Sequence, residues 1–287
     1  MNPRGVFSRN HITEKNATMI EYQYYSDPTP HIFFPEVLPT KTYAELVFPY
    51  LEHSAKGRIG RDLYDGEPGY SKLVESPGWR DLHRMFTSES FVTWVLRIFA
   101  KDLERLGCRV NLSDAFHEPY LESRNTVHDV KGQISDRNVN ALFTRFDIQV
   151  ADGNYAPYVH LDRIRRVVGG VLFCADNREE GLVGGEFAFY RDLFFADDRR
   201  CFWPKLAKTF TVRHNTGVIF LNANTAFHGP RRIYALRGLR KWVYYAISSH
   251  QPTWSPCDSS RARNLAFKCK HTLEEVYRCL APAANLL

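Results

Sequence analysis

The spacing of hydrophobic residues changes near residue 140, from a helical period to strict alternation. Before that point, apolar residues recur every three or four positions, which is the spacing of one buried helix face. After that point, apolar and polar residues alternate, as they do on a half-buried strand. The pattern therefore predicts helices in the first half of the chain and a β-rich region in the second.

Two helices are predicted before residue 140. The first starts near Thr42, because Thr42 and Glu45 have the spacing of a capping box. The second starts after Ser88 and stops at Gly107, a residue type that commonly ends helices. The apolar face of the first helix consists of Tyr43, Leu46, Val47, Tyr50 and Leu51. The apolar face of the second helix consists of Phe91, Trp94, Val95, Ile98, Leu103 and Leu106. An extended segment is predicted at residues 31–34 and a tail helix at residues 272–280.

The β-rich region is predicted to start with a strand over residues 142–150. Its apolar face holds Leu142, Thr144, Phe146, Ile148 and Val150, and its polar face holds Arg145, Asp147 and Gln149. Further short apolar segments lie at residues 167–175, 187–190, 210–212, 218–221 and 242–247. Many short strands without helices between them favour an antiparallel sandwich or barrel over a parallel sheet. We therefore expect one mainly β domain with flanking helices, in which residues 1–139 form an arm and supporting helices, 140–250 the β core and 251–287 a helical tail.

The composition is that of an ordinary globular protein and excludes several other classes. The chain has 287 residues, of which 44% are hydrophobic and 24% charged, enough to fold without a metal or a disulfide. Arg97 interrupts the longest apolar run, so no membrane span is predicted, and the first residues lack the apolar core of a signal peptide. The six cysteines have no C-x-x-C spacing, which argues against a zinc ribbon or a disulfide scaffold. A reducing, cytoplasmic environment is expected.

His160, Asp162 and His228 are the candidate metal ligands of the β region. Residues two apart on a strand point to the same side, so His160 and Asp162 can reach one metal ion. Chance alone gives about one such His-x-acid pair in a chain of this composition, so the pair needs further support. His228 supplies it, because it follows Asp162 after a gap of 65 residues and is placed at the end of a predicted apolar strand. Two histidines and one carboxylate form the facial triad of non-haem iron oxygenases, and zinc hydrolases use similar ligands.

Arg240 follows His228 by twelve residues and starts a predicted strand. Its face is shared by Trp242 and Tyr244, two residues apart along the same strand. A guanidinium on a rigid strand beside a metal can bind a carboxylate through two parallel hydrogen bonds. The sequence therefore places a candidate anion-binding residue near the candidate metal ligands.

The motifs in this order resemble the 2-oxoglutarate- and Fe(II)-dependent dioxygenase superfamily, of the prolyl-hydroxylase-like type. The motifs are H-L-D at 160–162, G-G-E-F-A-F-Y at 184–190, F-L-N-A-N-T-A-F-H-G at 220–229 and G-L-R-K-W at 238–242. The resemblance covers about residues 140–248. It implies a double-stranded β-helix, also called a jelly roll or cupin-like fold, as the core.

The resemblance also implies a role for individual residues. His160, Asp162 and His228 match the iron ligands, and Arg240 matches the residue that holds the distal carboxylate of 2-oxoglutarate. The implied cofactors are Fe(II), 2-oxoglutarate and O2, with ascorbate as a reductant. Relatives often add a tyrosine from the strand after the H-L-D motif, but residues 171–174 read V-L-F-C here. The candidates for that role are Tyr155, Tyr158 and Tyr244.

Arginines cluster after both ligand motifs. The net charge of +6 points only weakly to an anionic partner. Each cluster is either a solvated basic loop or the place where a carboxylate or phosphate of the substrate binds. The candidate substrate-binding residues are Arg163, Arg166 and Arg231. The chain lacks the long basic helix and interleaved aromatics of a nucleic-acid binder, so no such partner is predicted.

We expect an oxygenase that oxidises a C–H bond of a small polar or anionic metabolite, such as an amino acid or a natural-product intermediate. Succinate and CO2 are the expected co-products. An aspartate at position 162, in place of glycine or alanine, favours hydroxylation or desaturation over halogenation by resemblance. The alternatives are a peptidyl or protein hydroxylase and a non-catalytic jelly-roll protein that binds a ligand. The sequence does not determine the substrate or the oligomeric state.

Some histidines and aromatics have simpler interpretations. His214 is expected to be a turn residue, and the adjacent pairs His117–Glu118 and His128–Asp129 are expected to be surface groups, because neighbouring side chains diverge on a strand. Four aromatics are expected to lie in the core, namely Phe173, Phe187, Phe189 and Trp242.

Overall fold

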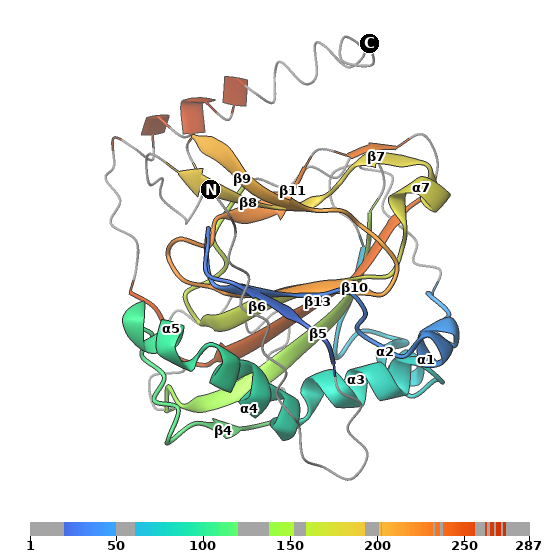
Figure 1. Ribbon diagram of the computed structural model, residues 1–287, viewed down its shortest axis with the longest axis horizontal. Helices are drawn as coiled ribbons and strands as arrows, with labels where there is room; N and C mark the ends of the chain where they lie inside the picture. Colours follow the sequence, from blue (N-terminus) through green and yellow to red (C-terminus); the bar gives the residue numbers. More distant parts are fainter. Residues whose placement is uncertain are drawn as a thin grey trace.

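Two β-sheets lie one above the other, with helices beneath the larger one (Figure 1). The computed structural model describes residues 20–49, 61–119, 138–151, 159–192, 201, 203–231, 233–235 and 238–255, and in the tail 262, 265–266, 268–270 and 272–273. The chain is therefore mainly β with flanking helices, as the hydrophobic pattern predicted. Most of the predicted tail helix lies outside the described residues.

The larger sheet contains eight of the described strands in the order β1-β2-β10-β6-β13-β5-β3, with β4 also paired to β5. Only the β4–β5 pair is parallel. The strands are β1 (Gln23–Tyr25), β2 (His31–Phe34), β3 (Arg61–Leu63), β4 (Phe116–His117), β5 (Ala141–Ala151), β6 (Arg166–Phe173), β10 (Thr216–Leu221) and β13 (Arg240–Ser249). Strands far apart in sequence are thus neighbours, and β13 runs between β6 and β5.

The smaller sheet has the order β11-β8-β9, and β12 and β7 form a separate pair. These strands are β7 (Leu182–Gly184), β8 (Phe187–Asp192), β9 (Pro204–Phe210), β11 (His228–Pro230) and β12 (Ile233–Ala235). Each apolar segment predicted after residue 160 contributes to a strand. The segment predicted at residues 210–212 is misplaced, because β9 ends at Phe210 and does not start there.

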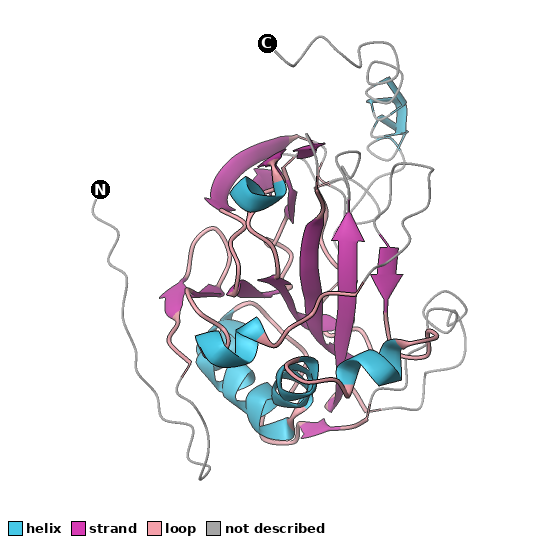
Figure 2. Ribbon diagram, turned by 90° about the vertical axis from the view of Figure 1, so that its right-hand side faces the viewer, coloured by secondary structure: helices cyan, strands magenta, loops and turns pink. Residues whose placement is uncertain are grey.

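Helices pack on the face of the larger sheet that points away from the smaller one (Figures 1 and 2). They are α1 (Thr40–Ala44), α2 (Tyr70–Val74), α3 (Trp79–Thr87), α4 (Glu89–Ile98) and α5 (Ala100–Arg105), while α7 (Asn177–Glu180) precedes β7. Trp79 and Val95 from the helices meet Phe146 and Ile148 of β5 in one apolar core. The apolar face of β5 therefore points to the helices, and its polar face points to the space between the sheets. Among the described residues, no helix is both long and apolar enough to cross a membrane.

The helix predicted after Ser88 is confirmed, with a break at Phe99 that divides it into α4 and α5. The Ser88 side chain accepts a hydrogen bond from the Phe91 backbone N–H at 3.2 Å, which is a normal N-terminal cap. Gly107 follows α5 with a φ of +73°, a conformation that suits glycine at the end of a helix.

The helix predicted from Thr42 is wrong in length and in its capping box. α1 ends at Ala44, follows Pro39, and has no side-chain cap and no buried residue. The Trp79 indole N–H donates to the Val47 carbonyl at 2.9 Å, and the Val47 side chain is 76% exposed. The backbone after Ala44 is thus bound by α3 rather than by its own helix. Tyr50 and Leu51 lie outside the described residues.

A second apolar cluster fills the space between the two sheets. Phe173, Phe187, Phe189 and Trp242 belong to it, and each is at most 4% exposed. The expectation that these aromatics lie in the core is therefore confirmed, although Phe187 and Trp242 also line the cavity described below.

His31 on β2 makes the stability of the fold depend on pH. Its side chain is fully buried, its Nδ1 lies 2.7 Å from the Thr29 carbonyl, and its ring packs against Tyr25 and Phe189. Burial lowers its pKa from 6.5 to about 4; nearby Lys208 also lowers the pKa, whereas Asp27 and the bond to Thr29 raise it. The unfolded chain therefore binds a proton at this histidine more tightly than the folded chain does. The contribution of neutral His31 to the free energy of unfolding is complete above pH 6.5 and is lost as the pH falls towards 4.

We expect the free energy of unfolding of the wild type to fall more steeply between pH 7 and pH 4.5 than that of His31→Gln. The full difference is about 3 kcal/mol, at about 1.4 kcal/mol per unit of pKa. Urea denaturation at several pH values measures both slopes, and equal slopes would contradict the assignment to His31.

Candidate active site

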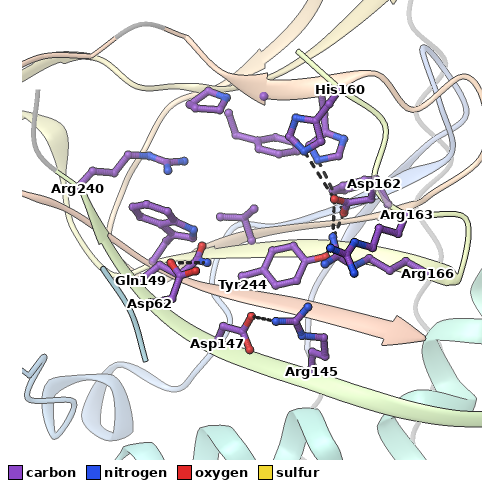
Figure 3. A pocket seen from close by; sticks show the side chains of 17 residues that line it. Asp62, Arg145, Asp147, Gln149, His160, Asp162, Arg163, Arg166, Arg240 and Tyr244 are labelled. Carbon is purple, nitrogen blue, oxygen red and sulfur yellow. Dashed lines mark hydrogen bonds and ion pairs between the residues drawn. The ribbon is translucent and has the colours of Figure 1, made fainter. Parts of the chain in front are cut away.

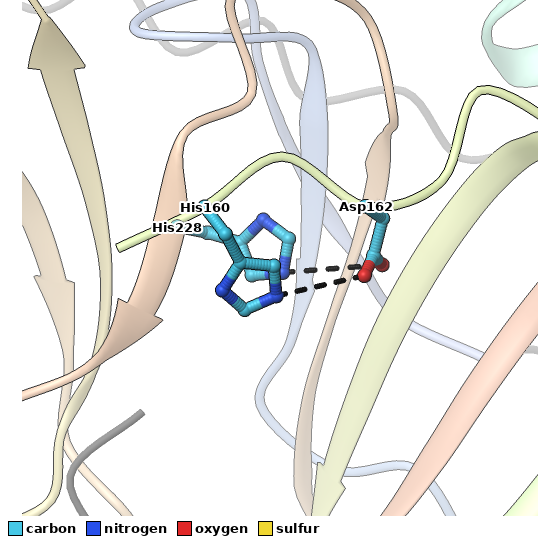
Figure 4. Close-up of side chains that lie close together, drawn as sticks. All are labelled: His160, Asp162 and His228. Carbon is cyan, nitrogen blue, oxygen red and sulfur yellow. Dashed lines mark ion pairs between the residues drawn. The ribbon is translucent and has the colours of Figure 1, made fainter. Parts of the chain in front are cut away.

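His160, Asp162 and His228 converge at one point between the sheets (Figure 4). Their candidate ligand atoms all lie within 4.8 Å of one another, and no other such group occurs in the part of the chain that the structure describes. His160 Nε2 is 3.6 Å from one Asp162 oxygen, and His228 Nε2 is 3.9 Å from the other. The backbones of His160 and His228 exchange two hydrogen bonds, of 3.0 and 2.9 Å. This pairing brings together two candidate ligands that are 68 positions apart in the sequence.

The donor set is in the chemical form that binds a metal. His228 Nδ1 lies 2.9 Å from the Ala226 carbonyl, which can only accept a hydrogen bond, so Nδ1 carries the proton and the Nε2 lone pair faces Asp162. Burial, together with the charge of His160, lowers the pKa of His228 to about 4, so its ring is neutral at pH 7. Two imidazoles and a carboxylate suit Fe(II) as well as Zn²⁺.

Two further side chains hold the Asp162 carboxylate. The Arg166 guanidinium donates to Oδ1 at 2.5 Å, and the Tyr244 hydroxyl donates to Oδ2 at 3.0 Å. Burial opposes the charge on Asp162, but Arg166 and the two histidines outweigh it and bring the pKa of this carboxyl well below its usual range. Arg166 was expected at the substrate and Tyr244 at 2-oxoglutarate, and both contact the carboxylate of Asp162, a candidate metal ligand.

Gly169 on β6 leaves room for this carboxylate. A Cβ atom at Gly169 would lie 2.7 Å from Phe220 and 3.2 Å from Asp162 Oδ2, whereas one at Gly170 would lie 3.0 Å from Ile219 and 3.1 Å from the Val218 carbonyl. Of these two neighbouring glycines on one strand, Gly169 thus faces the candidate metal site and Gly170 faces the helix-side core.

We expect Gly169→Ala to weaken metal binding about tenfold or more, as loss of a group that orients a ligand does. Gly170→Ala is the matched control, because it should lower the melting temperature without changing metal affinity. Calorimetric titration with Mn²⁺ measures affinity without turnover, and equal affinities of the two variants would contradict the prediction.

A cavity of about 290 Å³ adjoins the three ligand residues (Figure 3). It is near the lower end of the range for cavities that hold small ligands, roughly 300–1,000 Å³. Its lining includes seven of the residues predicted from the sequence, namely His160, Asp162, Arg163, Arg166, His228, Arg240 and Tyr244. Arg231 does not line it: its side chain is 52% exposed and lies 3.9 Å from Glu186. Tyr155 and Tyr158 lie outside the described residues.

Arg240 lies across the cavity from the ligand residues (Figure 3). It is the first residue of β13 and is only 2% exposed. Its guanidinium carbon lies 4.2 Å from the centre of the Trp242 ring and 5.7 Å from that of Phe173. Burial strengthens the Coulomb attraction of a guanidinium for a carboxylate, and packing against aromatic rings helps to fix the position of the guanidinium.

The polar face of β5 forms a wall of the same cavity. Arg145, Asp147 and Gln149 line it, together with Asp62 of β3. The Arg145 guanidinium donates to Asp147 at 2.6 Å, and the Gln149 amide donates to Asp62 at 3.0 Å. The sequence indicated a polar strand face here, but it assigned that face no role. The signal that could have indicated this role was a row of charged residues on a strand whose other face is strongly apolar.

His117 and His214, two described histidines that the sequence singled out, do not line this cavity. His214 is in the turn before β10, where Nδ1 is 2.8 Å from the Tyr43 hydroxyl and Nε2 is 2.8 Å from Glu179. The turn predicted around His214 is therefore confirmed. His117 is on β4, and His128 and Asp129 are outside the described residues.

No protein-family model matches the chain, and no curated protein matches it significantly. Several solved structures are similar to it. A prolyl 4-hydroxylase from Phytophthora capsici has a TM-score of 0.37 at 15% identity, covering 76% of this chain, which spans only 57% of that protein. A Pseudomonas putida prolyl-4-hydroxylase has a TM-score of 0.34 at 14% identity, with 76% and 92% of the two chains covered. A 2OG-Fe(II) oxygenase family oxidoreductase from Burkholderia pseudomallei has a TM-score of 0.38 at 14% identity, with 78% and 86% covered. Because every one of these TM-scores is below 0.5, the function of this chain has to be inferred from its own residues.

Proposed function

We propose that the chain is a 2-oxoglutarate- and Fe(II)-dependent oxygenase of the prolyl-hydroxylase-like type. One observation carries the proposal: His160, Asp162 and His228 meet at one side of a cavity, and the buried Arg240 lies at the other. A metal site of this kind leaves coordination positions open, and an arginine across the cavity suits the far carboxylate of a bound diacid.

The proposed core is a double-stranded β-helix over about residues 140–250. Two facing sheets of mainly antiparallel strands, with the candidate ligands between them, support it. The supporting helices before residue 140 pack on the outer face of the larger sheet. His228 on β11 and Arg240 on β13 are then held on strands, and His160 is held by its backbone bridge to His228, as precise positioning of reactants requires.

Each part of the site has a task in this reaction. His160, Asp162 and His228 hold Fe(II), which, with 2-oxoglutarate and O2, supplies the oxidising power for a C–H bond, with release of succinate and CO2. Arg240 holds the distal carboxylate of 2-oxoglutarate. Arg166 and Tyr244 orient the Asp162 carboxylate. The apolar walls formed by Val171, Phe187 and Phe220 exclude water from the reacting groups.

The proposed substrate is a small polar or anionic metabolite. The modest volume and the charged β5 wall of the cavity favour a small, polar molecule. A peptidyl hydroxylase is the second candidate, because a cavity of this size also accepts a single side chain. A non-catalytic ligand-binding protein is the third, and it would not need a metal site with open positions.

An anaerobic titration tests the proposal. Fe(II) and 2-oxoglutarate added together to the wild type should produce a visible metal-to-ligand charge-transfer band, whereas Zn²⁺ should not. The absence of this band would overturn the proposal. Succinate formation in air, screened against a metabolite library with mass spectrometry of the products, then separates metabolite from peptide substrates.

A further inference from the structure

Four ionic side chains in the cavity remain without a task in the proposed reaction. They are Asp62, Asp147, Arg145 and Arg163, two of each sign. His160, Asp162, His228 and Arg166 belong to the metal site, and Arg240 belongs to 2-oxoglutarate. The remaining part of the cavity therefore presents a balanced set of charges to whatever binds there.

These groups lie directly beside the residues assigned to 2-oxoglutarate. In the pairing of β5 with β13, Asp147 is opposite Tyr244 and Gln149 is opposite Trp242. Arg240, Trp242 and Tyr244 therefore share one sheet face with Arg145, Asp147 and Gln149. A molecule between this wall and the metal would touch the charged groups and present a C–H bond to the metal at the same time.

The two signs are separated along the cavity. Asp62 and Gln149 lie together below Arg240, whereas Arg163 lies beside Arg166 at the opposite side (Figure 3). Arg145 and Asp147 pair with each other between these ends, with side chains only 13% and 5% exposed. One end of the wall thus favours a cation and the other favours an anion.

We propose that this wall selects a zwitterionic substrate, a free amino acid, whose ammonium group faces Asp62 and Asp147 and whose carboxylate faces Arg163. The proposal rests on the proposed oxygenase function and names its substrate class. Charges in a partly buried site are stable only with opposite charges beside them. A purely anionic metabolite would offer no cationic group to the Asp62 end of the wall, and a peptide would replace the ionic groups of the zwitterion with neutral amides.

The test uses full-length wild type loaded with Fe(II) and 2-oxoglutarate, and a panel of free α-, β- and γ-amino acids. Each is compared with its N-acetyl and carboxamide derivatives, which remove one charge at a time. At least one free amino acid should shift the anaerobic charge-transfer band and increase succinate release in air about tenfold or more. Both derivatives should lose most of this effect, because a charge-assisted hydrogen bond contributes roughly tenfold or more to binding.

Single substitutions test which residues of the wall bind the ammonium group and the carboxylate of the substrate. Asp62→Asn should raise the half-saturating concentration of the amino acid about tenfold, with a smaller effect on that of 2-oxoglutarate. Arg163→Gln should abolish the preference for the free acid over its carboxamide. Asp81→Asn on α3 is the control, because the Asp81 side chain is 58% exposed. It should change neither the half-saturating concentration of the amino acid nor that of 2-oxoglutarate.

Three outcomes would overturn a proposal, and they are distinguishable. If the N-acetyl or carboxamide derivatives stimulate as strongly as the free amino acids, the zwitterion proposal is wrong while the oxygenase proposal stands. The same holds if no free amino acid changes the band or succinate release. If the wild type forms no charge-transfer band at all, the oxygenase proposal itself fails.

Discussion

His228→Ala should abolish the charge-transfer band at Fe(II) and 2-oxoglutarate concentrations that saturate the wild type. The substitution removes one of three ligands, and the buried Nε2 lone pair that faces Asp162 has no substitute among the described neighbours of that site. Loss of a group that merely orients a ligand costs about 10–100-fold in metal affinity, so loss of the ligand itself should cost at least about 100-fold. Anaerobic Fe(II) titration measures the band, and calorimetry with Mn²⁺ measures affinity without turnover.

His214→Ala is the matched control for this substitution. His214 lies in a turn, is partly exposed and contacts Tyr43 and Glu179 rather than the cavity. It should keep both the band and the metal affinity of the wild type. A folded His228→Ala protein with wild-type Fe(II) dependence would show that the metal lies elsewhere.

Arg240→Ala should raise the 2-oxoglutarate concentration needed for the half-maximal band about 100-fold, with little change in the Fe(II) requirement. Removing one partner of a buried charged pair costs roughly 2–5 kcal/mol, and each 1.4 kcal/mol is about tenfold in affinity. Arg240→Lys keeps the charge but loses the planar two-pronged geometry, so its effect should be intermediate.

The control for Arg240 is Arg84→Ala on α3, where the arginine side chain is 69% exposed. It should leave the 2-oxoglutarate and Fe(II) requirements unchanged. Near-ultraviolet circular dichroism checks that the Arg240 variants keep the packing around Trp242. Equal rises in the 2-oxoglutarate and Fe(II) requirements would remove Arg240 from the cosubstrate site.

Local pattern was sufficient for the strands β5, β6, β8, β10 and β13 and for one helix. The alternation over residues 142–150 predicted β5, because one face of that strand meets an apolar core and the other does not. Ser88 predicted the start of α4, because a capping side chain acts on a backbone group only three residues away. The helix from Thr42 was wrong because a residue of another helix, Trp79, binds the backbone where the helix would have continued.

The candidate ligands were found from spacing and from the order of motifs, but the surroundings of each ligand were not. Tyr244 is 82 positions from Asp162, and Asp62 is 87 positions from Gln149, yet each pair is hydrogen-bonded. Arg166 is only four positions from Asp162, but its contact depends on how the chain bends into β6. Nothing in the local pattern distinguishes an arginine that binds a metal ligand from one that binds a substrate.

The sequence by itself determined the β-rich class of the chain, the positions of its main strands and three candidate ligands of the right chemical type. These follow from side-chain periodicity and from residue chemistry, which act over a few neighbouring positions. Only the tertiary structure decided that the polar face of β5 lines the cavity and that Arg240 lies across from the ligands. It did so because strand pairing joins distant segments at a fixed register, and that register sets which side chains share a space.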